Sequence, residues 1–274
     1  MVEWEGFHDD RTGIPVYSLY GKTRSPLPEM LGNIDCLVID LPDVGARYYT
    51  FAWTMFLCLQ ACQKNNLSCI VLDRPNPING IMTEGPVLEP EFSSFVGLYP
   101  LPIRHSMTIG ELALYFNREF GIDCNLTVVP MNGWQREMWY ENTGLPWVMP
   151  SPNMPTVDTA IVYPGMALLE GTNISEGRGT TRPFEVFGNP FVDPYELVKA
   201  LKKEHLPGVT FRPLYFIPTF QKYHGEICGG AQIHITDRNA FLPVLTGVAI
   251  IRTIYHHYPE TFKWKDPPYE DLST

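Results

Sequence analysis

The stretch EGTNISEGRGTTRPFE, residues 170–185, holds the densest group of side chains that could do chemistry. Three glutamates and two arginines stand among glycines, threonines, a serine and an asparagine, whereas 45% of the whole chain is hydrophobic. Glu170 and Glu176 are candidate acids or bases, and Arg178 could clamp a carboxylate. Asn173 could hydrogen-bond to hydroxyl or amide groups. This composition suits an acidic carbohydrate, whose glycosidic bond is hydrolysed by carboxyl groups of this kind.

A structural role for the same stretch stays open, because its ion pairs could instead brace two parts of the fold. Gly177-Arg178-Gly179 is not a dinucleotide fingerprint, since no strand leads into it and its later spacing fails. The chain contains neither a phosphate-binding loop with Lys-Ser/Thr nor a Gly-x-Ser-x-Gly turn. No metal-ligand cluster or cofactor motif is visible in the sequence. We therefore expect neither a metal nor a cofactor.

Charged and amide side chains follow two predicted strands, at the point where each strand ends. They are Asp43 and Arg47 in IDLPDVGAR, and Asp73, Arg74 and Asn76 in VLDRPNP. In open parallel sheets, ligands bind beyond the carboxyl ends of the strands. These five residues are therefore candidates for a binding site, and Asp73 is also a candidate for catalysis. The alternative is that Asp73 and Arg74 cap or pair locally and hold the loop.

Three further candidates lie in connections after the second strand. Glu84 stands before Gly85 and Pro86 in a rigid turn, where a glutamate is more often solvated than catalytic. His105 precedes a predicted helix, whose positive N-terminal end favours a neutral imidazole that binds substrate or hydrogen-bonds a loop carbonyl. Asn153 lies between the prolines of SPNMPT, which restrict the backbone and so suit an amide side chain that must keep one orientation.

The apolar pattern predicts a mostly parallel sheet in the first part of the chain. Residues 36–41 and 68–74 are apolar runs, typical of strands buried on both faces, and a helix over about 50–65 separates them. This is β-α-β spacing. Residues 125–131 form a third strand, and the helix before it has a capping-box sequence that begins at Thr108.

A change of pattern near Arg182 divides the chain into two predicted domains. The first, residues 1–181, is α/β with a mostly parallel sheet, and it ends in an apolar helix that we expect to break near Pro164. The second, residues 182–274, is a smaller α+β unit. It has an amphipathic helix, for which Asp193 is the predicted cap and Pro194 stands in the first turn. Two strands of alternating pattern and a closing helix over 239–258 follow.

Composition and charge exclude several classes of partner. The net charge is −10 and lysines and arginines do not cluster, so we expect neither nucleic acid nor an anionic membrane as partner. No run approaches the roughly 20 apolar residues of a membrane span, and MVEWEGFHDDRTG lacks the apolar region of a signal peptide. The six cysteines are predicted to be free buried thiols. Cys58 and Cys62 are one helical turn apart but lack further zinc ligands nearby.

Five motifs together resemble the exo-acting β-N-acetylmuramidases, a bacterial family long catalogued as a domain of unknown function. They are IDLPDVGARYYTF, VLDRPNP, EGPVLEPEFSSFVGLYPLPIRHSMTIGELA, SPNMPT and EGTNISEGRGTTRPFE, which occur in family order and extend the resemblance over nearly the whole chain. The resemblance implies release of single N-acetylmuramic acid residues from the non-reducing ends of peptidoglycan fragments. Muropeptides are therefore the expected partners. It also implies a Rossmann-like first domain, a smaller second domain and an active cleft between them.

The resemblance also implies roles for several candidates. Glu176 or Glu84 would be the carboxylate that acts in the cleft. Arg178 and Arg47 would bind the lactyl carboxylate of N-acetylmuramic acid, and the amides in SPNMPT and EGTNISEG would hold hydroxyl or acetamido groups. The stereochemical outcome, retaining or inverting, stays open because it depends on the separation of two carboxyl groups in space.

The chain departs from the family pattern in three ways. Family members begin before Met1, and that preceding part supplies the first β-α unit and a Glu-His-Gly motif whose glutamate is the favoured acid. They also extend beyond Thr274. Pro42 and Ser106 stand where the family usually has glutamine and glycine. We therefore expect a chain truncated at both ends, with an exposed apolar strand edge and helix face and with marginal stability or association.

Two functions stay open at this level. The chain is an exo-β-N-acetylmuramidase if its own acids suffice, and a non-catalytic muropeptide-binding module if they do not. The family usually carries an export signal, which would precede Met1, so a location outside the cytoplasm is expected from the family alone. The sequence leaves the oligomeric state open.

Overall fold

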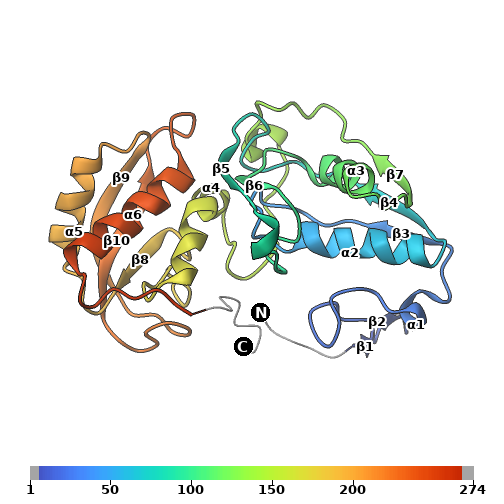
Figure 1. Ribbon diagram of the computed structural model, residues 1–274, viewed down its shortest axis with the longest axis horizontal. Helices are drawn as coiled ribbons and strands as arrows, with labels where there is room; N and C mark the ends of the chain where they lie inside the picture. The colour runs from blue at the N-terminus through green and yellow to red at the C-terminus, as the bar shows by residue number, and fades with distance from the viewer. Residues whose placement is uncertain (1–5, 267–274) are drawn as a thin grey trace.

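The computed structural model describes residues 6–266, which form two units side by side (Figure 1). The first unit contains a small hairpin, a three-stranded parallel sheet and a second hairpin. Its strands are β1 (Phe7–His8), β2 (Pro15–Val16), β3 (Cys36–Ile39), β4 (Ser68–Leu72), β5 (Glu84–Val87), β6 (Pro102–Arg104) and β7 (Asn125–Val129). Its helices are α1 (Pro28–Leu31), α2 (Phe51–Lys64) and α3 (Ile109–Glu119), with 3₁₀ turns η1 (Pro90–Phe92) and η2 (Tyr140–Thr143).

The second unit is an antiparallel sheet packed against helices. Its strands are β8 (Val186–Asn189), β9 (Val209–Phe216) and β10 (Cys228–Ile235), in the order β8-β10-β9. Its helices are α4 (Val157–Met166), α5 (Pro194–Leu201) and α6 (Pro243–His257), with 3₁₀ turns η3 (Ala167–Gly171) and η4 (Lys202–Glu204). The predicted alternating strands and the closing helix are confirmed.

The parallel sheet has the order β3-β4-β7, which confirms the β-α-β prediction. Helices α2 and α3 cover the face of β4 that carries Cys69 and Val71, and both of these side chains are fully buried. Trp53 of α2 stacks on Phe116 of α3 with ring centroids 5.3 Å apart. Burial of such large apolar side chains is the main source of stability in this layer.

The other face of this sheet corrects one prediction. Val38 of β3 is 55% exposed and Val129 of β7 is 45% exposed. The first two strands of this sheet, β3 and β4, were expected to be buried on both faces because their sequences are continuously apolar. Among the described residues, however, α2 and α3 cover one face only. The apolar run in β3 is therefore hydrophobic on both faces but buried on only one.

Local capping signals correctly predicted where two helices begin. Thr108 Oγ1 accepts a hydrogen bond from the Glu111 N–H at 3.2 Å, and Glu111 Oε2 accepts one from the Thr108 N–H at 3.0 Å, which completes a capping box for α3. Helix α5 begins in the same way, because Asp193 accepts hydrogen bonds from the N–H groups of Tyr195 and Glu196.

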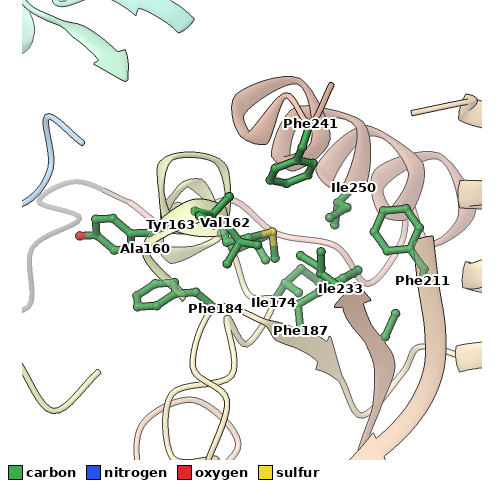
Figure 2. Packing of buried hydrophobic residues seen from close by; sticks show 14 of the residues in the cluster. Ala160, Val162, Tyr163, Ile174, Phe184, Phe187, Phe211, Ile233, Phe241 and Ile250 are labelled. Carbon is green, nitrogen blue, oxygen red and sulfur yellow. The ribbon is translucent and has the colours of Figure 1, made fainter. Parts of the chain in front are cut away.

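The second core forms around α4 (Figure 2). Tyr163 of α4 packs against Phe184, and Ile233 of β10 and Ile250 of α6 belong to the same buried cluster. Residues 157–181, which the sequence pattern placed in the first domain, therefore contribute to the core of the second unit. The break that was predicted near Pro164 is a change of helix type. Helix α4 includes Pro164, ends two residues later at Met166, and passes directly into η3.

Helices α4 and α6 approach each other at two glycines. A Cβ added at Gly165 would lie 1.8 Å from Pro243 O, and one added at Gly247 would lie 2.3 Å from Gly165 O. Only glycine permits backbones to come this close. The cluster around α4 also includes Val44 and Ile78 from the first unit, so the two units share buried apolar surface.

All six cysteines are free thiols, as predicted, and five of them are buried. Within residues 6–266, every helix is too short or too polar to cross a lipid bilayer.

Candidate active site

The first group of predicted residues surrounds the loop that follows β3. This loop pairs with β6 through a bridge between Ala46 and Arg104, and His105 follows directly. His105 Nε2 lies 3.2 Å from Asp43 Oδ2, and neither side chain is more than 2% exposed. The Met107 N–H donates to His105 Nδ1 at 3.2 Å, so the ring proton belongs on Nε2, the nitrogen nearer Asp43. This Nε2 is buried and makes no hydrogen bond. Asp43 Oδ1 is buried without a hydrogen bond.

Arg47 and Asn76, both predicted to bind substrate, have backbone partners in the structure. Arg47 Nη1 donates to Pro86 O at 2.9 Å and to Leu101 O at 2.5 Å, so it ties together the hairpin of β5 and β6. Burial lowers the pKa of Arg47. Asn76 Nδ2 donates to Met107 O at 2.9 Å. These partners are carbonyl oxygens. Arg47 ties the loop after β3 to the hairpin of β5 and β6, and Asn76 ties the loop after β4 to the segment before α3.

Asp73 and Arg74 make the local contacts that formed the alternative to a role in the site. Asp73 Oδ1 accepts from the Gly110 N–H at 2.7 Å, and Asp73 Oδ2 accepts from Thr108 Oγ1 at 3.1 Å. The carboxylate therefore adds to the capping of α3. Arg74 forms a bidentate pair with Asp40 at 2.7 Å, and both side chains are about half exposed.

Glu84 lies between the two units. Its Oε1 accepts a hydrogen bond from the Leu245 N–H at 2.8 Å, at the first turn of α6. Burial raises the pKa of Glu84, while hydrogen bonds from the backbone of α6 and the charge of Arg104 oppose that shift. Its Oε2 is buried without a partner. The structure thus places Glu84 at the N-terminus of α6.

The second group of predicted residues forms an ion-pair network within residues 170–185, the charged stretch. Arg178 Nη2 lies 2.6 Å from Glu170 Oε1, and Arg178 Nε lies 3.4 Å from Glu176 Oε1. Lys222 Nζ lies 2.9 Å from Glu176 Oε2 and also donates to the carbonyls of Leu169 and Ile174. The side chain of Glu176 is only 3% exposed, whereas that of Glu170 is 36% exposed. Glu170 is therefore the carboxyl group of this network that a solute can reach.

The electrostatic environment distinguishes the members of this network. Burial raises the pKa of Glu170, Arg178 opposes the shift, and the carboxylate of Glu176 reinforces it. Burial alone would lower the pKa of Arg178, but Glu170 and Glu176 outweigh it and the pKa is raised. Burial lowers the pKa of Lys222 despite its contact with Glu176. The network thus contains an accessible carboxyl group that holds its proton more tightly than usual, beside a carboxylate contacted by two cations.

Tyrosines connect the two groups of residues. Tyr48 follows Arg47, whose guanidinium carbon lies 5.6 Å from the ring centroid of Tyr48. Burial raises the pKa of Tyr48; Arg47 opposes this shift and Glu170 reinforces it. Tyr49 packs edge-on against Tyr163 of α4 with centroids 6.2 Å apart. The site therefore lies where the loop after β3 meets the segment that contains η3.

The two candidate asparagines differ in their surroundings. Asn173 Nδ2 donates to Thr261 O at 2.8 Å, and its Oδ1 accepts from the Lys263 N–H at 2.9 Å, so the amide holds the chain after α6. Asn153 lies in the turn before α4 and is partly exposed. Asn153 is thus the freer of the two amides to contact a ligand.

Sequence reasoning missed Lys222 and Tyr48 as members of the site. Tyr48 stands in the quoted motif ARYYTF, directly after a residue that was selected, and that adjacency was an available signal. Lys222 lies in a loop with no periodic pattern, and nothing in the sequence links it to Glu176. Among residues 6–266, no group of three or more His, Cys, Asp or Glu side chains is arranged to hold a metal ion.

Comparison with known proteins places these residues in a family. A family model described as "Exo-beta-N-acetylmuramidase NamZ, N-terminal" matches residues 1–158, and one described as "Exo-beta-N-acetylmuramidase NamZ, C-terminal" matches residues 161–273. The chain belongs to the NamZ exo-β-N-acetylmuramidase family. The two NamZ models meet near the start of α4, where the second core begins.

Relatives of the NamZ family support this assignment. The chain is 56% identical to the peptidoglycan β-N-acetylmuramidase NamZ of Bacillus subtilis strain 168. The alignment covers 256 residues, which are 93% of this chain and 62% of that relative. This chain thus spans less than two thirds of that relative's length. Two crystal structures of DUF1343 family proteins from Bacteroides fragilis NCTC 9343 share the fold. One has a TM-score of 0.88 and 42% identity over 92% of this chain and 67% of that one. The other has a TM-score of 0.75 and 29% identity over 96% of this chain and 70% of that one.

Proposed function

We propose that this chain is a glycoside hydrolase that releases N-acetylmuramic acid from the non-reducing ends of peptidoglycan fragments during cell-wall turnover. Family membership supports the reaction class, and the name of the Bacillus subtilis relative supports peptidoglycan as the substrate. The observation in the structure that carries the proposal is the pairing of Glu170 and Glu176 on one guanidinium, that of Arg178.

Glu170 has the properties of a proton donor for a leaving oxygen. It is 36% exposed, and burial and a neighbouring carboxylate raise its pKa. Glycosidases need one carboxyl group that keeps its proton and a second group that stays ionised, and the environments of the two set them apart. Glu176 is the natural partner, because Arg178 and Lys222 both contact it and compensate its charge.

Arg178 is the group that we propose for the lactyl carboxylate of the sugar. Its Nη2 donates to Glu170 and its Nε lies 3.4 Å from Glu176, and because a guanidinium has five N–H donors, further donors remain for a ligand carboxylate. Asn153, partly exposed in the turn before α4, is the amide proposed for the acetamido or hydroxyl groups. Glu84 is instead proposed to support the site indirectly, through its contact with α6.

The direct test is release of N-acetylmuramic acid from the disaccharide N-acetylmuramyl-N-acetylglucosamine, followed by chromatography and mass spectrometry. We expect release by the wild-type chain. Replacement Glu170→Gln should lower the rate by about 10²–10⁴-fold, the usual contribution of a general acid, and leave disaccharide binding measurable by calorimetry. Exposed Glu91→Ala is the matched control and should leave the rate unchanged.

The outcomes separate the possible functions. Binding of the disaccharide by wild type without any release would favour the non-catalytic muropeptide-binding module. Absence of both binding and release would contradict a role in peptidoglycan metabolism. Full activity of Glu170→Gln would show that another residue is the acid, and Glu176→Gln and Glu84→Gln would then be compared in the same assay.

A further inference from the structure

Three thiols meet in the core of the first unit, and none of the roles assigned so far uses them. Cys62 lies on α2, Cys69 on β4, and Cys124 directly before β7. Cys62 and Cys69 are fully buried, and Cys124 is 6% exposed. All three belong to the core cluster between the helices and the parallel sheet. The thiols of Cys69 and Cys124 both hydrogen-bond to that of Cys62, which is therefore the centre of the group.

The fold brings these thiols together at one end of the sheet. A turn of residues 65–67 connects α2 to β4, and the Leu67 N–H closes it by donating to Cys62 O at 2.9 Å. The amide of Asn117 fixes Cys124, because it accepts from the Cys124 N–H at 2.9 Å and donates to the Cys124 carbonyl at 3.1 Å. The thiols thus lie at the amino-terminal ends of β4 and β7, whereas the loops of the candidate active site follow the carboxyl ends of β3 and β4.

The turn after Cys62 lies at the surface. Residues 63–66 are all exposed, although Cys62 directly before them is buried. Asn66 has a φ of +55°, a left-handed conformation that is uncommon for residues other than glycine. Helix ends and exposed turns open at a lower free energy than the core of a fold. Local opening here brings Cys62 into contact with small solutes while the rest of the unit stays folded.

Their contacts make the three thiols chemically unequal. The hydrogen bond with Cys69 lowers the pKa of Cys62, burial opposes that shift, and Cys124 adds to it. The same contact raises the pKa of Cys69, and burial adds to that shift. Burial raises the pKa of Cys124 to about 11. The thiolate is the nucleophilic form of cysteine, so Cys62 is the nucleophile of the group.

We propose that Cys62 and Cys69 are a peroxide-sensitive pair that forms a disulfide between the end of α2 and the start of β4. Sensor cysteines of this kind combine a thiolate with a neighbouring thiol that resolves the first oxidation product. Cys69 is the partner rather than Cys124, because the same turn connects it to Cys62 and keeps the two close when that turn opens. Neither cysteine has a role in the proposed glycosidase reaction.

The reaction balances with hydrogen peroxide as the oxidant. The Cys62 thiolate attacks one peroxide oxygen, which breaks the O–O bond and leaves a sulfenic acid on Cys62 and a free hydroxide. Cys69 then loses its proton, and its sulfur attacks that of Cys62, which forms the S–S bond and releases a second hydroxide. The protons of the two thiols convert both hydroxides to water. The two thiols lose two electrons in all, and the peroxide gains them.

The test is treatment of the folded, reduced wild-type chain with hydrogen peroxide, followed by alkylation, trypsin digestion and mass spectrometry. Trypsin cleaves after Lys64, so a disulfide between Cys62 and Cys69 links the peptide of residues 48–64 to that of residues 65–104. We expect this linked pair, and we expect a reductant to separate it. Mapping of the wild-type chain needs no variant, so it does not depend on how a substitution affects folding.

Three variants identify the reacting thiols. Cys62→Ser should abolish the link. Cys69→Ser should also abolish it, and should leave a sulfenic acid on Cys62 that dimedone traps. Cys58→Ser is the matched control and should leave the link unchanged, because Cys58 is buried on the same helix one turn earlier and belongs to the same tryptic peptide.

The contrary results are distinct. If the folded wild-type chain keeps all its thiols and the link forms only in urea, the cluster is an inert part of the core and the proposal is overturned. A link from residues 48–64 to the tryptic peptide of residues 119–136 would replace Cys69 by Cys124 as the partner. A link that survives Cys62→Ser and is lost in Cys58→Ser would overturn the assignment of Cys62 as the nucleophile.

Discussion

Glu84 accepts a hydrogen bond from the backbone N–H of Leu245, 2.8 Å away and 161 residues further along the chain. Helix α6 has Leu242 at its N-cap and Pro243 at its first position, and no side chain of its own caps it. Glu84 therefore supplies from β5, in the first unit, the cap that α6 lacks in the second. The contact fixes the two units relative to each other close to the place where they share buried surface.

Loss of this cap should destabilise the protein. We expect Glu84→Ala to lower the free energy of unfolding by about 1–2 kcal/mol, as for other helix caps. Glu84→Gln keeps an acceptor oxygen and should cost less. Urea denaturation followed by circular dichroism measures both. Glu91→Ala, an exposed position in η1, is the control and should stay within about 0.5 kcal/mol of wild type. Equal stability of Glu84→Ala and this control would show that the cap contributes nothing.

The raised pKa of Glu84 predicts a pH dependence with a definite sign. Folding raises this pKa above its ordinary value of 4.5, so the folded state holds the proton more tightly than the unfolded chain does. The associated stability is present in full below the unfolded pKa and is lost as pH rises through the folded pKa. Wild type should therefore lose stability relative to Glu84→Gln as the pH is raised from about 4.5 toward neutral. Denaturation of both proteins across this range measures the difference, in which the similar contribution of Glu170 cancels. A constant or growing advantage of wild type would contradict the assignment.

The elements that sequence predicted well are those whose signals lie within a few residues. The capping box at Thr108 and the aspartate cap of α5 are local hydrogen-bond patterns, and both helices begin where these patterns place them. The strands of the parallel sheet were equally visible as short apolar runs. Val38 shows what such runs cannot predict. An apolar sequence does not determine which face of the sheet other elements will cover, and Val38 lies on the face that stays exposed.

The candidate site was predicted less completely, because its partners are distant in sequence. Asp73 was selected for its place at the end of a strand, and Glu84 for its residue type. Their partners decide their roles, however, and for Glu84 that partner lies in the other unit. Lys222 contacts Glu176 across 46 residues. The charged stretch itself was correctly recognised as unusual. Its internal pairing, including that of Glu185 with Arg182, depends on tertiary packing that no local pattern encodes.

The crossing of α4 and α6 should tolerate no side chain at Gly165. A Cβ there would lie 1.8 Å from Pro243 O, and both groups belong to helices in the second core. Only a displacement of the backbone could remove this clash. We therefore expect Gly165→Ala to lower the free energy of unfolding by about 3 kcal/mol or more. Gly32→Ala is the control, because its φ is −63° and its new Cβ would meet only Pro28 O, at 3.5 Å. Thermal denaturation of both variants tests this, and similar melting temperatures would refute the close approach.

Lys222 and Glu176 should behave as a coupled pair. Lys222→Met removes one of two cations from a carboxylate whose side chain is 3% exposed, and it leaves two backbone carbonyls without their donor. Breaking one side of such a pair costs about 3 kcal/mol or more, because the remaining charge stays buried. The double variant with Glu176→Gln removes both charges, so its loss should be smaller than the sum of the single losses by about 1–3 kcal/mol. Lys199→Met, which breaks an exposed pair with Glu196, is the control and should change stability by less than about 1 kcal/mol. Strictly additive losses in the double variant, measured by urea denaturation, would show that the contact between Lys222 and Glu176 carries no energy of its own.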